Sequence, residues 1–161
     1  MMLGRAIIAI AGLLAMTGGL WPASGEDAAP AIRAGEYRVP FQVHDGLIYV
    51  QGRVNGVRAT LLIDTGAALT TFTLRVVPTL ETDSRITINM AKGSVLASRL
   101  PVGFVLGDSD LRKSHCSFHQ NVVVGAFKFL DADGLVGQDV LSRFKSVTFD
   151  FKNSTLILED R

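Results

Sequence analysis

The sequence predicts an all-β domain, a barrel or sandwich, with one short helix near its C-terminus. Short segments of β-branched and aromatic residues recur along the chain, and turn residues separate them. The clearest signal is Asn55-Gly56, which joins strand-like segments at 47–54 and 57–63, because both residues tolerate the positive φ angles of a two-residue hairpin. Only residues 138–144 have the pattern of a short helix. Many short strands with regular turns are typical of a barrel or sandwich.

Residues 1–25 have the pattern of a signal peptide. A positive charge at Arg5 precedes the unbroken apolar run 6–16, and small residues at 23–25 have the spacing that signal peptidase recognises. The run is shorter than the roughly 20 residues that span a bilayer, so we expect cleavage and export to the periplasm or the medium. An uncleaved anchor is the alternative, since residues 19–21 could lengthen the span and place Trp21 at the interface.

The remaining chain is expected to form a leader and one domain. Residues 26–37 are small, polar and rich in Ala and Pro, which indicates a flexible leader, and 38–161 form the domain. The formal net charge of +1 gives no indication of nucleic acid or an acidic membrane as partner. Cys116 is the single cysteine, so no internal disulfide can form and the core must supply the stability.

The strands are expected in an order that alternates with turns. In chain order they are 37–43, 47–54, 57–63, 70–74, 86–90, 94–97, 102–106, 121–124, 147–151 and 155–158. The segments 86–90 and 94–97 flank Lys92-Gly93, which indicates a second hairpin, and 152–154 is expected to turn the last two strands back on each other. Residues 107–120 are expected to form a long polar loop.

The chemistry of the sequence is concentrated at Asp64-Thr65-Gly66, which follows the apolar strand 57–63. A carboxylate at the end of an apolar strand is costly unless it is partnered or hydrogen-bonded. Gly66 permits a tight turn, and the Thr65 hydroxyl can bond the backbone nearby. The tripeptide alone is expected by chance in roughly three of a hundred chains of this length, and an ordinary strand-ending turn is the simplest alternative. The hairpin before it and the Thr-rich strand after it strengthen the signal.

In this context the chain resembles the retropepsin-like aspartic peptidases, the family of retroviral proteases and their bacterial relatives. The resemblance lies in residues 62–67 with Thr70, and in Gly134-Leu135-Val136-Gly137, where the family places an apolar pair and a glycine before a short helix. The hairpin 147–158 also resembles bacterial members. The resemblance implies a retropepsin-like closed β barrel, one half of the acid-protease architecture, with the short helix near the C-terminus.

The resemblance further implies an aspartic endopeptidase, a hydrolase in which two carboxylates about 3 Å apart share a proton and activate a water. The chain has one Asp-Thr-Gly, and residues 131–134 lack an apolar lead-in strand. A homodimer with Asp64 from each copy is therefore expected. Asp64 is the expected catalytic residue, with Thr65 and Gly66 as its scaffold. The expected partner is a peptide or protein substrate, and no metal or organic cofactor is required.

Two segments depart from the family pattern. Residues 90–94 lie where a substrate-covering flap is expected, with Lys92 and Gly93 at its tip, but the tip has one glycine and no aromatic residue. This assignment therefore depends on chain order alone. The polar segment 107–120 is long for a compact protease. Both differences concern substrate preference more than fold.

Other candidate sites are weaker. His115, Cys116 and His119 could ligate a metal, but in an extended segment the two histidines face one way and Cys116 the other, so no metal site is expected. Asp131 and Asp133 have the pattern of turn residues.

Two other functions stay open: a non-catalytic module that binds peptides by strand addition, and a structural envelope protein tethered by its N-terminus. The intact Asp64-Thr65-Gly66 favours the enzyme.

Overall fold

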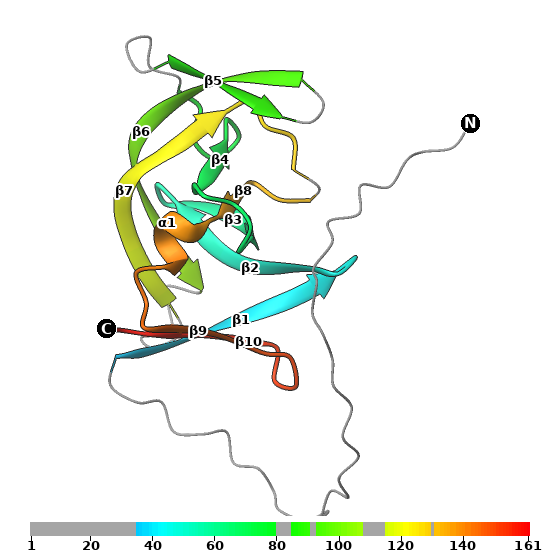
Figure 1. Ribbon diagram of the computed structural model, residues 1–161, viewed down its shortest axis with the longest axis vertical. Helices are drawn as coiled ribbons and strands as arrows, with labels where there is room; N and C mark the ends of the chain where they lie inside the picture. The colour runs from blue at the N-terminus through cyan, green and yellow to red at the C-terminus, as the bar shows by residue number, and fades with distance from the viewer. Residues whose placement is uncertain (1–34, 80–84, 91–92, 108–114, 130) are drawn as a thin grey trace, which may run out of the picture. The chain divides into compact units, whose positions relative to one another are not determined.

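The computed structural model describes residues 35–79, 85–90, 93–107, 115–129 and 131–161 (Figure 1). The predicted signal peptide, the predicted leader up to residue 34, and Lys92 lie outside this part, so these predictions stay predictions. Among the described residues, no helix has the length and apolar character needed to cross a membrane.

The described chain is built almost entirely of strands. They are β1 (Glu36–His44), β2 (Leu47–Val54), β3 (Val57–Ile63), β4 (Thr71–Thr73), β5 (Arg85–Met90), β6 (Gly93–Gly107), β7 (His115–Gly125), β8 (Gly134–Val136), β9 (Ser146–Asp150) and β10 (Thr155–Glu159). The helix α1 (Gln138–Leu141) is shorter than the predicted 138–144. It ends early because the amides of Arg143 and Phe144 bond the carbonyls three residues back, in tighter turns. The all-β prediction with one short helix is confirmed.

Six strands close into a barrel-like ring. Its hydrogen-bonded order is β6, β7, β4, β8, β3 and β2, and an additional pairing of β2 with β6 completes it (Figure 1). β5 extends the sheet from β6, while β1, β10 and β9 extend it from β2. Most pairs are antiparallel, but β3 with β8 and β4 with β7 are parallel. The parallel pairs bring segments distant in sequence together around the end of β3.

Two-residue hairpins join the first three strands, and the second of them is the one predicted at Asn55-Gly56. Asp45 and Gly46 have φ angles of 50° and 78°, and Asn55 and Gly56 have 47° and 81°. These positive values are the ones that a type I′ turn requires. The two strands predicted to flank Lys92-Gly93 pair as β5 and β6, with Met90 opposite Gly93, while Lys92 itself lies outside the described residues.

The prediction of a loop over 107–120 is wrong for its last six residues. Residues 115–120 belong to β7, which pairs with β6 from Ala97 opposite Gly125 to Gly107 opposite His115. The predicted strands 94–97 and 102–106 are likewise parts of the single strand β6. Polar residues such as Ser117 and His119 are exposed on one face of β7, whereas Cys116 is buried on the other. One face of such a strand packs against the core and the other meets solvent, so polar residues are tolerated on the outer face. The polar composition of residues 115–120 therefore resembled that of a loop.

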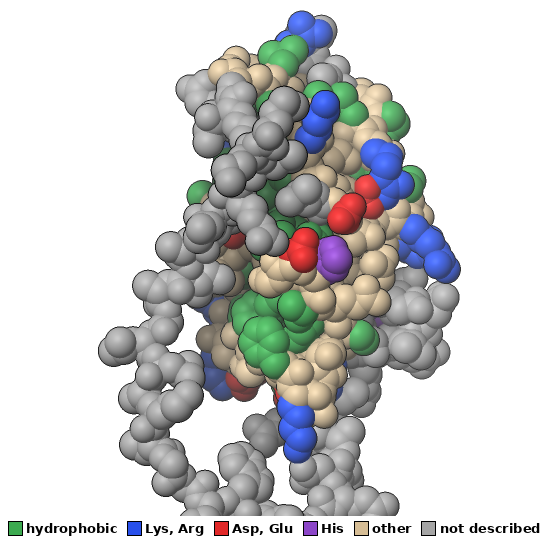
Figure 2. Space-filling view, turned by 90° about the vertical axis from the view of Figure 1, so that its right-hand side faces the viewer, with side chains coloured by type: hydrophobic (Ala, Val, Ile, Leu, Met, Phe, Trp, Pro, Cys, Tyr) green, Lys and Arg blue, Asp and Glu red, His purple; other side chains and the backbone are tan. Residues whose placement is uncertain are grey.

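The core lies inside the ring and beneath α1. Phe72 and Phe104 are fully buried and meet edge-on, with ring centroids 5.1 Å apart. Some apolar side chains are exposed instead, among them Val43 and Phe151, whose ring lies 5.6 Å from that of Phe41. Figure 2 shows a face on which hydrophobic side chains gather next to acidic side chains and a histidine.

Candidate active site

Asp64 stands at the end of β3, where the chain leaves the core. Ala59, Leu61 and Ile63 of β3 are buried, and β8 runs parallel beside the strand, with Ile63 opposite Val136. The Asp64 amide donates to the Val136 carbonyl at 3.1 Å, which extends this pairing by one residue. The backbone that carries the carboxylate is therefore held by the sheet, and the side chain is half-buried.

The residues after Asp64 form a tight turn around its carboxylate. The Gly66 amide donates to Asp64 Oδ1 at 2.9 Å, and the Ala67 amide donates to the Asp64 carbonyl at 3.3 Å. A side chain on Gly66 would place its Cβ only 3.3 Å from Asp64 Oδ1, so glycine leaves the carboxylate room. Gly66 and Thr65 are exposed, so the turn faces outward. The prediction of a tight turn at this place agrees with the geometry.

Thr65 contributes to the turn through its backbone. Its carbonyl accepts a hydrogen bond of 2.8 Å from Nε2 of Gln138, the first residue of α1. Among the described residues its hydroxyl has no hydrogen-bond partner. The Thr65 side chain is exposed, so this hydroxyl can form a hydrogen bond with another molecule.

A buried threonine anchors the far end of this loop. Thr70 is fully buried, and both its amide and its hydroxyl donate to Asp139 Oδ1, at 2.8 and 2.7 Å. The Gly137 amide donates in turn to the Thr70 hydroxyl oxygen at 3.1 Å. Asp139 Oδ2 accepts from Gln120 Nε2 at 3.0 Å. Asp139 thus ties the Asp64 loop to α1 and β7.

Backbone contacts complete the junction between the loop and α1. The Gln138 amide donates to the Ala67 carbonyl at 2.8 Å, and the Asp139 amide donates to the Ala68 carbonyl at 3.3 Å. A Cβ on Gly137 would lie 2.8 Å from the Ala67 carbonyl oxygen, so only glycine permits this approach. This is the physical reason for a glycine in Leu135-Val136-Gly137.

Sequence reasoning missed Gln138 and Asp139 as supports of the site. The only signal was their place directly after Gly137, in the first turn of a predicted helix. Nothing in the local pattern indicates that an acid there reaches Thr70, which is 69 residues away. The contact depends on the parallel pairing of β3 with β8.

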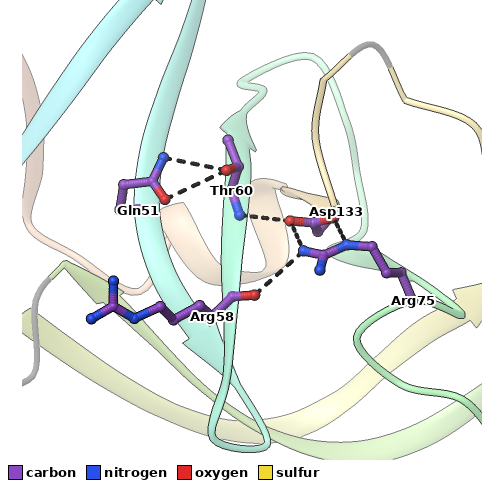
Figure 3. A network of polar contacts seen from close by, with 5 residues as sticks. All are labelled: Gln51, Arg58, Thr60, Arg75 and Asp133. Atoms are coloured by element: carbon purple, nitrogen blue, oxygen red, sulfur yellow. Dashed lines mark hydrogen bonds and ion pairs between the residues drawn. The ribbon is translucent and has the colours of Figure 1, made fainter.

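A second acid, Asp133, holds the strands behind the site together (Figure 3). Its carboxylate accepts from the Thr60 amide at 2.8 Å and forms an ion pair with Arg75, whose guanidinium also donates to the Arg58 carbonyl at 3.3 Å. Its backbone amide donates to the Thr60 carbonyl, and its carbonyl accepts from the Thr73 amide, both at 2.8 Å. Asp133 therefore links β3, β4 and β8. Its role extends beyond the turn predicted from its sequence neighbours.

Within one chain, Asp64 has no acidic partner among the described residues. Its carboxylate has a single hydrogen-bond donor, Gly66, whereas Asp139 has donors on both oxygens and Asp133 is paired with Arg75. Asp131 lies on an exposed turn with a φ angle of 53°. Asp64 therefore keeps acceptor capacity that Asp133 and Asp139 use for their own contacts.

The remaining candidate residues that the structure describes lie on β6 and β7 and not on the loop that carries Asp64. His119 is exposed on β7, while Cys116 points into the core, where burial raises the pKa of its thiol to about 11. In the part of the chain that the structure describes, no group of three or more His, Cys, Asp or Glu side chains could hold a metal ion. Gly93, the described member of the candidate flap tip, begins β6.

The fold is similar to solved protease structures. A retropepsin-like aspartic protease from Rickettsia conorii matches with 25% identity and a TM-score of 0.51, over 78% of this chain and 91% of that one. The retroviral protease-like domain of Ddi1 from Leishmania major has 17% identity and a TM-score of 0.48, over 71% and 90% of the two chains. EIAV protease has 16% identity and a TM-score of 0.40, over 58% and 84%.

Sequence comparison gives no further assignment, since no family model and no curated protein matches the chain. The structural match to the Rickettsia protein shows that the chain has the retropepsin-like fold, as its sequence predicted.

Proposed function

We propose that this chain, which has the retropepsin-like fold, is an aspartic endopeptidase with Asp64 as its catalytic residue. The observation that carries the proposal is the state of the Asp64 carboxylate: its backbone is held by β8 and its side chain keeps most of its hydrogen-bonding capacity free. A carboxylate that is fixed in position and open to solvent can bind and deprotonate a water. The similar Rickettsia structure is described as an aspartic protease.

Hydrolysis needs two carboxylates that share one proton. One takes a proton from the attacking water, and the other donates its proton to the carbonyl oxygen of the peptide bond. The resulting tetrahedral diol breaks its C–N bond when the nitrogen is protonated, which releases an amine and a carboxylic acid. Two carboxyl groups about 3 Å apart share a proton because both cannot be ionised cheaply.

The second carboxylate is that of Asp64 in another copy of the chain. The turn that carries Asp64 is exposed at Thr65, Gly66, Ala68 and Leu69, which are small or apolar side chains. Small residues let two such turns approach closely around a two-fold axis, which is the geometry that an isologous dimer requires. Thr65, with its unoccupied hydroxyl, stands at this surface.

The test is the substitution Asp64→Asn, measured on peptide hydrolysis and folding in the same preparation. We expect hydrolysis of a diverse peptide library at acidic pH to fall at least about a thousandfold, because the amide cannot accept the water proton. The circular dichroism spectrum should not change, since the side chains are nearly isosteric. Pepstatin should inhibit the unsubstituted protein.

Asp131→Asn is the matched control, because it removes an exposed carboxylate from a turn whose positive φ angle asparagine also tolerates. Equal turnover in Asp64→Asn and the unsubstituted protein would refute the catalytic role. If neither protein hydrolyses any peptide but both bind peptides, the chain is the non-catalytic binding module instead.

We propose that this enzyme acts outside the cytoplasm. The charged start, the apolar run 6–16 and the small residues 23–25 support a cleaved signal, with the mature chain beginning near Glu26. N-terminal sequencing of protein from the extracytoplasmic fraction tests this. Recovery of a chain that retains Met1 in the membrane pellet would favour the anchor.

A further inference from the structure

A cavity of about 280 Å³ adjoins the loop that carries Asp64. Its walls come from the loop, from β6 and β7, and from α1 with the turn after it; the residues that matter here are Leu69, Thr70, Arg99, Gln120, Asp139 and Arg143. Leu69 and Thr70 follow Asp64 by five and six residues. The cavity thus shares Thr70, Gln120 and Asp139 with the anchor of the Asp64 loop, and Leu69, Arg99 and Arg143 are added to them.

The charge around this cavity is unbalanced. Arg99 and Arg143 are exposed at its wall, and neither forms an ion pair with a carboxylate among the described residues. Arg143 Nε donates to the main-chain carbonyl of Asp139 at 3.2 Å, which holds this guanidinium near the cavity. The one acid in the wall, Asp139, uses its oxygens for Thr70 and Gln120. Two arginines therefore line a cavity whose wall holds one carboxylate, that of Asp139, and the lining carries a net positive charge.

The wall also contains a buried acceptor that lacks a donor. The carboxylate of Asp139 accepts from the amide nitrogen of Gln120, and this contact fixes which way the amide group points. The other end of the amide, Gln120 Oε1, is buried and has no hydrogen-bond partner among the described residues. A buried acceptor without a donor costs free energy, so a group that donates to it is favoured there.

The geometry points to a binding site for an acidic amino-acid residue of a peptide. Such a residue combines a carboxylate for the two arginines with a backbone N–H for Gln120 Oε1. This oxygen has less than 1 Å² of accessible surface, so the Gln120 amide turns toward the ligand to accept the bond. Planar carboxylates bind guanidinium groups through paired, charge-assisted hydrogen bonds. A phosphate ion would satisfy the arginines but carries no N–H donor.

As part of the proposed enzyme, this cavity selects substrates with Asp or Glu at a position remote from the cleaved bond. This statement about substrates rests on the proposed function, whereas binding of the acidic residue itself does not. Binding energy from a remote residue raises kcat/KM for the substrates that carry it.

Binding is tested directly by NMR on isotopically labelled protein that carries Asp64→Asn. The probes are N-acetyl-glutamate N-methylamide, its uncharged glutamine counterpart, and inorganic phosphate. We expect the glutamate probe to shift the amide signals of Thr70 and of residues 120–123, and the other two probes to bind at least about tenfold more weakly. Arg99→Gln and Arg143→Gln should each weaken the glutamate probe about fivefold or more.

Arg58→Gln is the matched control, because Arg58 is an exposed arginine outside the cavity wall, and it should bind the glutamate probe unchanged. Equal shifts with the glutamate and glutamine probes, no shifts at these residues, or phosphate binding as tight as glutamate would each overturn the assignment.

Hydrolysis then separates this inference from the proposed function. In the protein with native Asp64, Arg99→Gln should lower kcat/KM for peptides with a remote Glu and leave their Gln counterparts unchanged. Glutamate binding without hydrolysis of any peptide would refute the enzyme and leave the acidic-residue site standing. Hydrolysis without glutamate binding would refute the acidic-residue site and leave the proposed enzyme standing.

Discussion

Three aspartates near the end of β3 differ in what their surroundings let them do. Asp133 is paired with Arg75 and bonded to the Thr60 amide, and Asp139 accepts from Thr70 and Gln120. Within the described part of the chain, the Asp64 carboxylate accepts from Gly66 alone. A carboxylate whose oxygens are occupied serves as a structural clamp, while one with free acceptor sites can bind a water. The same side chain thus has a structural role at two positions and the proposed catalytic role at the third.

Replacing Asp139 tests whether its hydrogen bonds or its charge hold the loop. In Asp139→Ala, two donors of fully buried Thr70 lose their acceptor, so we expect a loss of about 2–4 kcal/mol in the free energy of unfolding. In Asp139→Asn, the amide oxygen still accepts from Thr70, and Gln120 can turn its unpartnered Oε1 toward the new NH₂ group. This loss should stay below about 1 kcal/mol.

Urea unfolding curves of the two Asp139 variants measure both values. A loss as large in Asp139→Asn as in Asp139→Ala would show that the negative charge, and not the hydrogen-bond geometry, is required. Turnover per folded molecule should fall in Asp139→Ala and persist in Asp139→Asn, because the contact between residue 139 and Thr70 fixes the position of the loop that carries Asp64.

Cys116 provides a prediction about pH. Burial raises the pKa of its thiol from 9.0 to about 11, with a smaller contribution from Asp160. The folded thiol therefore stays protonated at pH 8 and should react with a disulfide reagent only as fast as the protein unfolds. Because the folded pKa is the higher one, the stability from the neutral thiol is full below pH 9 and is lost between pH 9 and 11.

Between pH 9 and pH 11, the free energy of unfolding should thus decline more steeply in the unsubstituted protein than in Cys116→Ala. The other titrating groups are the same in both proteins. Rapid modification at pH 8 under native conditions would contradict the burial of this side chain.

At the scale of the elements, the parallel contact of β3 with β8 organises the site. β8 has only three residues, but it pairs with β3 on one side and with β4 on the other. Gly134 lies opposite both Leu61 and Phe72 in these pairings. The glycine lets the three strands come together, because a larger residue would displace Phe72.

Two glycine substitutions separate crowding from backbone strain. In Gly134→Ala the new Cβ would collide with the Phe72 ring and lie 2.6 Å from the Thr71 carbonyl oxygen, so we expect a loss of about 3 kcal/mol or more. In Gly56→Ala nothing lies within 4 Å of the new Cβ, but the φ angle of +81° costs about 1 kcal/mol. Thermal and urea unfolding give both values. A smaller loss in the free energy of unfolding for Gly134→Ala than for Gly56→Ala would contradict the packing described, because β8 would then move to accommodate the new side chain.

At the scale of the whole molecule, the proposed function depends on assembly of two copies of the chain. Asp64 has no acidic hydrogen-bond partner among the described residues, and the exposed residues of its own turn, Thr65, Gly66, Ala68 and Leu69, are small or apolar. The proposed mechanism needs a second carboxylate, so it predicts that Asp64 of another copy supplies it and that activity depends on assembly.

Mixing unsubstituted chains with an excess of Asp64→Asn chains tests this requirement. Mixed dimers hold one native carboxylate, so activity should fall below the value given by dilution alone. Specific activity should also rise with enzyme concentration through the range of the dimer dissociation constant and then level off. Analytical ultracentrifugation in parallel reports the mass of the active species. A fully active monomer would exclude the two-copy site.

The sequence by itself determined the local features of this protein. Asn55-Gly56 specified a hairpin, and Asp64-Thr65-Gly66 specified a tight turn after an apolar strand, because turn chemistry and strand periodicity act over a few residues. The resemblance carried by residues 62–67 and 134–137 indicated the fold. Only the tertiary structure decided that residues 115–120 form a strand, that Asp139 anchors Thr70, and that two arginines border a cavity. These features depend on residues far apart in sequence, and their pairing follows from how the strands close into a ring, which no local pattern encodes.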